Sequence, residues 1–184
     1  QIMEATTGKY LYSLIHNSSI TAIEWSPDGT KLVSASYDRT LRIWNASNGA
    51  LITTFEGHTG IVRFAAWSPD GTRVASVGED YTTRIWDAST GTQLVKYAFA
   101  RDNYSYSWAV RSSEWSPDGS QITLSNNKVA VLCDASTFGV LFRYEGPNNK
   151  ISSNPDGYKL LITNGNTAII IDVMTGKLIS DLRG

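Results

Sequence analysis

The 184-residue chain carries 16 Lys and Arg against 17 Asp and Glu, a formal net charge of −1, with 41% hydrophobic and 18% charged residues. This composition is typical of a folded domain, and its scattered charges exclude the clustered basic surface that nucleic-acid binding needs. The N-terminus lacks a signal-type segment, and no apolar run approaches the roughly 18 residues of a membrane span, so we expect a cytoplasmic protein without a membrane partner.

A five-residue phrase, Trp-Ser-Pro-Asp-Gly, occurs three times, and a fourth copy reads Ser-Asn-Pro-Asp-Gly. The copies are 42, 48 and 38 residues apart and begin at Trp25, Trp67, Trp115 and Ser153. A second marker follows 18 or 19 residues later and is centred on Trp44, Trp86, Cys133 and Ile171. These periods bracket the roughly 40 to 45 residues of one four-stranded propeller blade, so the sequence predicts a radial all-β array.

The first repeat contains four β-type segments separated by turn residues, namely 20–25, 31–36, 40–44 and 50–55. Pro27 and Gly29 favour a tight turn after the first segment, because proline fixes φ and glycine accepts a positive φ. The second repeat reproduces the pattern at 61–67, 73–77, 82–86 and 93–97. Helical spacing of apolar residues is absent, so each repeat is expected to form one four-stranded sheet.

The repeats divide the chain into five expected units. They are the tail of a preceding blade at 1–14, in which 9–14 is its outer strand, and then four blades at about 15–56, 57–99, 100–146 and 147–184. Three arrangements are open: a piece of a longer propeller, a half-ring that pairs with a second copy, or an open or four-bladed array. We favour the first two, as part of a ring of seven or eight blades, because an open array exposes sheet edges to aggregation.

Several markers resemble the WD40 family: the pair Gly57-His58, the closing Ile85-Trp86-Asp87, and the turn residues Asp38 and Asp80. The resemblance covers essentially the whole chain and implies a β-propeller of WD40-type blades. It also implies a structural network of His, Ser, Asp and Trp in each blade. Carried over to this chain, the network comprises His16, Ser34, Asp38 and Trp44 in the first blade and His58, Ser76, Asp80 and Trp86 in the second.

Ser34 and Ser76 are chosen for this network over Ser36 because Gly78 stands at the position equivalent to Ser36. The third and fourth blades lack the histidine, have Asn126 and Asn127 near the turn of the third, and have Cys133 and Ile171 in place of tryptophan. We therefore expect those blades to be less tightly tied together. Cys133 is interpreted as a small buried hydrophobic residue.

Serine, histidine and aspartate together also suggest a hydrolase, but the trio recurs in two blades and no Gly-x-Ser-x-Gly elbow surrounds either serine. The Asp-Gly turns lack the further acidic ligands of a calcium loop, the two histidines do not form a metal cluster, and no phosphate-binding glycine loop is present. We therefore expect no catalytic residue, metal or cofactor, and a chain that is not an enzyme.

An insertion at 100–108 accounts for the long second spacing and carries a set of potential interface anchors: Arg101, Tyr104, Tyr106 and Trp108. The alternation of its aromatic residues is also typical of a strand packed on the next blade, and both interpretations are open. In WD40 proteins one propeller face commonly receives partner peptides. The resemblance implies that four further residues reach this face, namely Tyr37, Arg63, Glu79 and Arg111.

The expected function is that of a non-enzymatic scaffold or sensor module that binds a protein or peptide through the propeller face. The alternative is a propeller accessory domain of a larger enzyme, such as a peptidase or an ATPase-type regulator.

Overall fold

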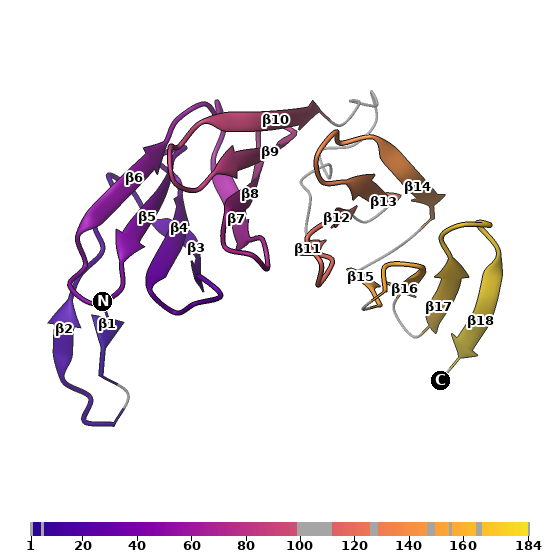
Figure 1. Cartoon of the computed structure of the whole chain (residues 1–184), viewed down its shortest axis with the longest axis horizontal. Coiled ribbons are helices and arrows are strands. Elements are labelled where there is room, and N and C mark those ends of the chain that lie inside the picture. The colour runs from indigo at the N-terminus through magenta and orange to yellow at the C-terminus, as the bar shows by residue number, and fades with distance from the viewer. Residues whose placement is uncertain are drawn as a thin grey trace.

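The computed structural model describes residues 2–4, 6–98, 112–125, 129–146, 150–154, 156–164 and 167–183. Within these ranges all regular secondary structure is β-strand, in 18 strands. They form one two-stranded sheet and four four-stranded sheets, and every pairing is antiparallel (Figure 1). The predicted all-β array of four-stranded units is confirmed.

Each four-stranded sheet is a meander of consecutive strands. Sheet 1 contains β3 (Ile20–Trp25), β4 (Lys31–Ser36), β5 (Leu41–Asn45) and β6 (Leu51–Phe55). Sheet 2 contains β7 (Val62–Trp67), β8 (Arg73–Gly78), β9 (Thr82–Asp87) and β10 (Gln93–Ala98). Sheet 3 contains β11 (Ser112–Trp115), β12 (Gln121–Ser125), β13 (Val129–Asp134) and β14 (Val140–Glu145). Sheet 4 contains β15 (Lys150–Ser153), β16 (Lys159–Asn164), β17 (Thr167–Asp172) and β18 (Leu178–Arg183).

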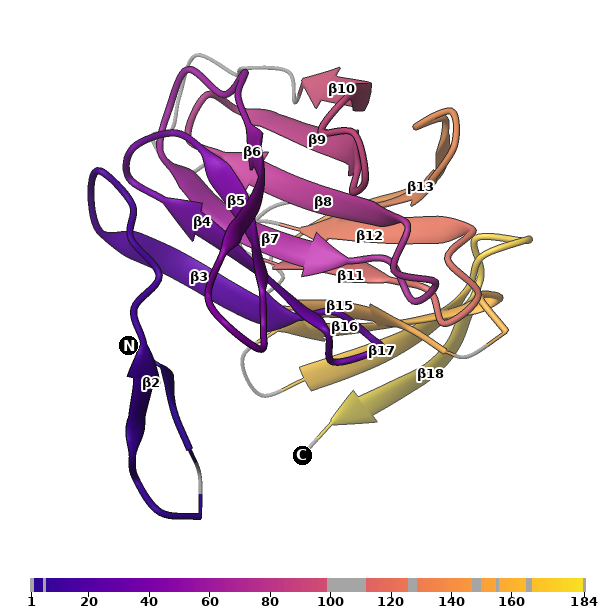
Figure 2. The same ribbon diagram turned by 60° about the vertical axis from the view of Figure 1, so that its left-hand side comes forward.

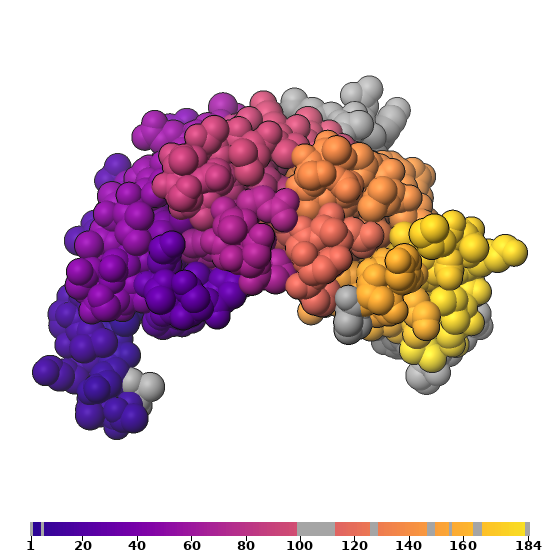
Figure 3. Space-filling model, in the orientation of Figure 1, coloured from indigo at the N-terminus to yellow at the C-terminus, as the bar shows by residue number. Residues whose placement is uncertain are grey.

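The sheets follow one another in chain order along an arc (Figure 1). The first strand of each lies on the concave side and the last on the convex side, and the turned view shows the four sheets as successive layers (Figure 2). The space-filling view shows the same curved outline, in which neighbouring sheets are in contact and the first and last sheets lie apart (Figure 3). The described residues do not close a ring.

The repeated Trp-Ser-Pro-Asp-Gly phrase forms the hairpin turn between the first two strands of sheets 1 to 3. Gly29 and Gly71 both have a φ of 68°, a left-handed conformation that favours glycine. Ser26 Oγ donates to Asp28 Oδ1 at 2.6 Å, and Asp28 Oδ1 accepts from the Thr30 amide at 3.0 Å. The turn therefore satisfies its own polar groups, which explains its recurrence.

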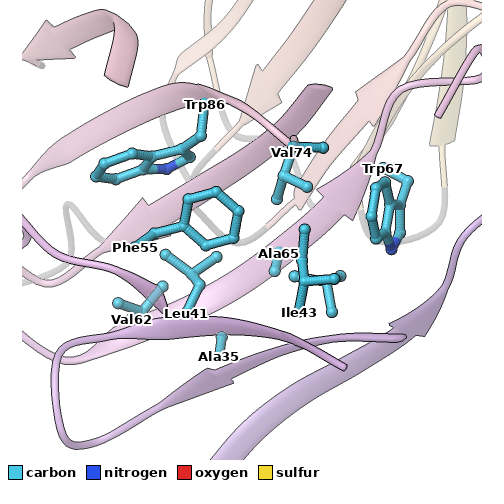
Figure 4. Close-up of a cluster of buried hydrophobic side chains, with 11 residues drawn as sticks. Ala35, Leu41, Ile43, Phe55, Val62, Ala65, Trp67, Val74 and Trp86 are labelled. Carbon is cyan, nitrogen blue, oxygen red and sulfur yellow. The ribbon is translucent and has the colours of Figure 1, made fainter. Parts of the chain in front are cut away.

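Apolar residues of neighbouring sheets meet between the layers. Between sheets 1 and 2, Leu41, Ile43 and Phe55 pack against Val74 and Trp86 (Figure 4). Full burial of one such side chain stabilises the fold by about 1.5–3 kcal/mol. Successive side chains along a strand point to opposite faces of the sheet. Sheets 2 and 3, which have a neighbouring sheet on each face, therefore contribute to two such cores.

A further core joins sheets 2 and 3, where Ile85 packs with Ile122 and the fully buried Cys133. Sheets 3 and 4 meet through Leu132 and Ile171 and their neighbours. At the start of the arc, β1 (Ile2–Met3) and β2 (Tyr10–Tyr12) form an N-terminal hairpin. Ile2 and Tyr12 of this hairpin, with Leu14, pack against Leu32 and Trp44 of sheet 1. None of the described residues belongs to a helix long and apolar enough to cross a membrane.

Candidate interaction site

A hydrogen-bond network joins the segment before β3 to the rest of sheet 1. His16 Nδ1 lies 2.9 Å from Asp38 Oδ2, and His16 Nε2 lies 2.7 Å from Ser34 Oγ. Trp44 Nε1 donates to the same serine oxygen at 2.8 Å. The Asn17 amide donates to Asp38 at 3.0 Å. The structure therefore brings together the four residues that the resemblance implies and ties the segment before β3 to the turn between β4 and β5.

Sheet 2 repeats the arrangement. His58 Nδ1 lies 3.0 Å from both carboxylate oxygens of Asp80, and His58 Nε2 lies 2.8 Å from Ser76 Oγ. Trp86 Nε1 donates to Ser76 Oγ at 2.8 Å. One tautomer satisfies every group: Nδ1–H donates to the carboxylate, and the serine hydroxyl donates to Nε2 while it accepts from the indole.

The charge states follow from burial and hydrogen bonding. Burial lowers the pKa of His58 and outweighs the hydrogen bond and charge of Asp80, which act to raise it. Burial opposes ionisation of Asp80, but hydrogen bonds from the Thr59 amide, the Thr82 hydroxyl and His58 outweigh it and lower its pKa. A neutral histidine beside an ionised aspartate is the result.

Sequence reasoning missed two further members of the network in each sheet. Thr82 Oγ1 donates to Asp80 Oδ1 at 2.8 Å, and Thr40 makes the equivalent bond to Asp38 at 2.6 Å. An arginine four residues after each aspartate lies within 3.5 Å of its carboxylate, and the two are Arg42 and Arg84. The sequence could have revealed these residues, because the same threonine and the same arginine recur 42 residues apart in the two repeats.

The orientation of serine, histidine and aspartate resembles that of a hydrolytic triad, but the geometry does not support nucleophilic attack. Ser34 and Ser76 are fully buried, so no substrate reaches their hydroxyls. Each hydroxyl oxygen also accepts an indole N–H. The arrangement stabilises turns instead of activating a nucleophile.

Sheets 3 and 4 replace both the serine and the tryptophan of the network with apolar residues. Leu124 and Cys133 take the two positions in sheet 3, and Ile162 and Ile171 take them in sheet 4. All four are buried. Each of these sheets lacks both the indole N–H donor and the serine hydroxyl acceptor, so neither of the two positions holds an unpaired polar group.

A second cluster links sheets 1 and 2 at the end of the strands where this network lies. Arg63 of β7 places its guanidinium carbon 4.9 Å from the ring centroid of Tyr37, which follows β4. Arg63 Nη1 donates to the Tyr37 hydroxyl at 2.9 Å, and Arg63 Nε donates to Glu79 Oε1 at 2.8 Å. We call Tyr37, Arg63 and Glu79 the junction surface; all three are exposed. The hydrogen bond from Arg63 to Glu79 contributes most to raising the pKa of the Arg63 guanidinium.

Comparison with known families decides the identity of these repeats. The model of the family described as "WD domain, G-beta repeat" matches residues 8–45 and 49–87. Residues 8–87 carry WD40 repeats. The two matched segments cover β2 to β9, which is all of sheet 1 and the first three strands of sheet 2, and they include both histidine networks.

Several curated proteins are similar to this chain over segments of 45 to 58 residues. "Notchless protein homolog" of Arabidopsis thaliana is 40% identical over 45 residues, which are 24% of this chain and 10% of that protein. "WD repeat-containing protein 1" of Mus musculus is 40% identical over 58 residues, 29% of this chain and 10% of that protein. "Proteasomal ATPase-associated factor 1" of Homo sapiens is 49% identical over 47 residues, 26% of this chain and 12% of that protein. The matches thus span about a tenth of each relative.

The remaining residues predicted to bind a partner lie outside the described residues. They are Arg101, Tyr104, Tyr106, Trp108 and Arg111, and the turn residues Asn126 and Asn127 fall outside as well. The two interpretations of the 100–108 insertion stay open. Among the residues that the structure describes, no group of three His, Cys, Asp or Glu could hold a metal ion.

Proposed function

We propose that this chain is a non-enzymatic platform that binds a protein or peptide partner at the junction surface and through the 100–111 segment. The observation that carries the proposal is the exposed Tyr37–Arg63–Glu79 cluster, in which an arginine is held by an aromatic ring on one side and a carboxylate on the other. Arginine and tyrosine are enriched among the residues that dominate interface energetics. Their mutual contacts reduce the side-chain entropy lost on binding.

The WD40 assignment supports the class of function, because WD40 repeat proteins generally serve as protein-interaction scaffolds. The two histidine networks support the choice of the junction surface as the binding site, because they hold the turns next to it. Asp38 and Asp80 are locked by histidine, threonine and backbone donors, so the turns that carry Tyr37 and Glu79 are preorganised. A surface built on such turns binds with little rearrangement.

Affinity capture with a triple variant tests the proposal. In the triple variant, Arg63→Glu and Arg111→Glu are combined with Trp108→Ala. The matched control combines Lys159→Glu with Lys177→Glu, two exposed charge reversals at the opposite end of the strands. We expect the wild type and the control to recover the same partners, and the triple variant to lose them with an unchanged thermal midpoint. Equal recovery by the folded triple variant would remove this surface from consideration.

We further propose that additional β-sheets cover the two ends of the arc. Ile23 and Trp25 of sheet 1 are 49% and 54% exposed, whereas Ala65 and Trp67, at the equivalent positions of sheet 2, are 3% and 5% exposed because sheet 1 covers them. At the other end, Leu161 and Leu182 of sheet 4 are exposed, while the equivalent Val33 and Phe55 of sheet 1 are buried.

The added sheets would come from the rest of a longer propeller or from a second copy of this chain. Light scattering on the 184-residue chain distinguishes the two sources. A defined dimer supports pairing of two copies, and a monomer or a polydisperse aggregate supports a longer polypeptide. If Trp25→Ser left a dimer unchanged, the sheet 1 face would not be the contact.

A further inference from the structure

A pocket lies between the Ser-Pro-Asp-Gly turns of sheets 1 and 2, at the opposite end of the strands from the junction surface. Its volume is about 310 Å³. Residues 26–28 form one wall and residues 69–71 the other, with Trp67 in the lining and Lys31 at the side. Figure 4 shows Trp67 at the end of the sheet 1–sheet 2 core opposite Trp86. This pocket takes no part in the function proposed above.

The equivalent space between sheets 2 and 3 is filled by an arginine of the chain itself. The Arg73 guanidinium carbon lies 4.9 Å from the ring centroid of Trp115. Arg73 Nη2 donates to the Gly119 carbonyl at 2.8 Å, and Nη1 donates to the Ala135 carbonyl at 3.3 Å. An aromatic ring and two backbone oxygens therefore form a guanidinium slot at this junction.

Two of these parts, Trp67 and Gly71, line the pocket between sheets 1 and 2, and the third has its counterpart in the sequence. Trp67, Gly71 and Ala88 stand at the repeat positions of Trp115, Gly119 and Ala135. The turns are also packed in the same way: a Cβ built on Gly71 would lie 3.8 Å from Pro27 Cδ, and one built on Gly119 would lie 3.6 Å from Pro69 Cδ. The two junctions differ at the residue that fills the slot.

Lys31 occupies the position of Arg73. Its side chain makes no hydrogen bond or ion pair with any residue that the structure describes, and the slot remains an open pocket. An ammonium group cannot reproduce the planar fork that donates to two carbonyls while it stacks on a ring. The sequence difference between lysine and arginine thus accounts for the pocket.

Each wall of the pocket contains one aspartate. Hydrogen bonds from Ser26 and Thr30 lower the pKa of Asp28 to about 2. Hydrogen bonds from Ser68 and from the Thr72 amide lower the pKa of Asp70. Both carboxylates are ionised at neutral pH and are held by their own turns, which favours a cationic occupant.

We propose that this pocket binds the arginine side chain of a partner polypeptide. The inserted guanidinium lies against Trp67, donates to the Gly71 carbonyl, and is flanked by Asp28 and Asp70. Arg73 is the intramolecular example of the same recognition, one junction further along the arc.

The test uses the 184-residue chain and N-acetyl-L-arginine amide as the probe. N-acetyl-L-citrulline amide, which has the same length but no charge, is the control ligand. Binding is followed through the indole N–H signal of Trp67 in two-dimensional NMR titrations. We expect saturable binding of the arginine derivative, and affinity for the citrulline derivative weaker by about tenfold or more.

Three variants make the test specific. Lys31→Arg places an internal guanidinium in the slot and is expected to weaken probe binding by about tenfold or more. Lys31→Ala leaves the slot open and is expected to bind at least as well as the wild type. Asp28→Asn with Asp70→Asn keeps the acceptors of the turn hydrogen bonds but removes the charge, and is expected to bind more weakly. The proposal fails if Lys31→Arg binds the probe like the wild type, or if the citrulline derivative binds equally well.

Discussion

Trp86 donates its indole N–H to Ser76 Oγ at 2.8 Å, deep between sheets 1 and 2. The same hydroxyl lies 2.8 Å from His58 Nε2 and so connects the core to the turn that holds Asp80. Sheet 1 makes the same connection through Trp44 and Ser34. The bond between Trp86 and Ser76 connects the hydrophobic core to the histidine network, so its removal should destabilise both.

We expect Ser76→Ala to lower the free energy of unfolding by about 1–3 kcal/mol, because it leaves the Trp86 N–H and the His58 Nε2 without their partner in a buried site. Urea unfolding followed by tryptophan fluorescence measures the change. Ser113→Ala is the matched control, since Ser113 is also buried and its hydroxyl has no hydrogen-bond partner among the described residues. Equal losses in the two variants would contradict a special role for the network.

The two histidines should make stability depend on pH. Burial lowers the pKa of both His16 and His58 from 6.5, so the unfolded chain binds protons first as the pH falls. Stability should therefore decrease below about pH 6.5, by at most about 1.4 kcal/mol per pH unit for each histidine. The pKa values of Asp38 and Asp80 are lowered, so these two aspartates stay ionised between pH 6.5 and 5, and within the two networks this loss belongs to the histidines.

Urea midpoints at several pH values between 7.5 and 5 test this dependence. A double variant, His16→Gln with His58→Gln, has lower stability but should have a flatter pH profile over this interval. A wild-type midpoint that rises on acidification would mean that the pKa values of the histidines are raised by their aspartates instead.

The single thiol should be inert in the folded protein. Cys133 is fully buried, and burial raises its pKa to about 12. At pH 8 we expect an aromatic disulfide reagent to label it about a thousandfold more slowly than a free thiol, because little thiolate exists and the reagent cannot reach it. Labelling in urea supplies the unfolded rate, and rapid labelling of the native chain would show that sheet 3 opens readily.

Gly78 has a specific steric role in sheet 2. A Cβ atom there would lie 2.4 Å from His58 Nδ1 and 2.7 Å from Asp80 Oδ1. We expect Gly78→Ala to displace this pair and to cost about 1–3 kcal/mol of stability. Ser36→Ala, at the equivalent position of sheet 1, removes a hydroxyl that accepts from the Asp38 amide but adds no bulk, so it should cost about 1 kcal/mol. A larger loss in Ser36→Ala than in Gly78→Ala would refute the steric explanation.

The sheets and turns could be predicted because their causes are local. Proline and glycine at fixed places in the Trp-Ser-Pro-Asp-Gly phrase determine a turn within five residues, and alternating apolar segments determine the strands on either side. The members of the histidine network followed from the resemblance. Thr82 and Arg84 were missed, although both are repeated in sheet 1 and lie two and four residues after Asp80, because the resemblance implied only histidine, serine, aspartate and tryptophan.

The sequence by itself determined the repeat, the strand order and the positions that a network of this family occupies. Only the tertiary structure decided which side chains meet across the boundary between two sheets. Arg63 reaches Tyr37 from the next sheet, and Arg73 fills a slot that Lys31 leaves open one junction earlier. These relationships involve residues 26 to 62 positions apart. Their geometry depends on how neighbouring sheets stack, and the periodicity of a single strand carries no information about that stacking.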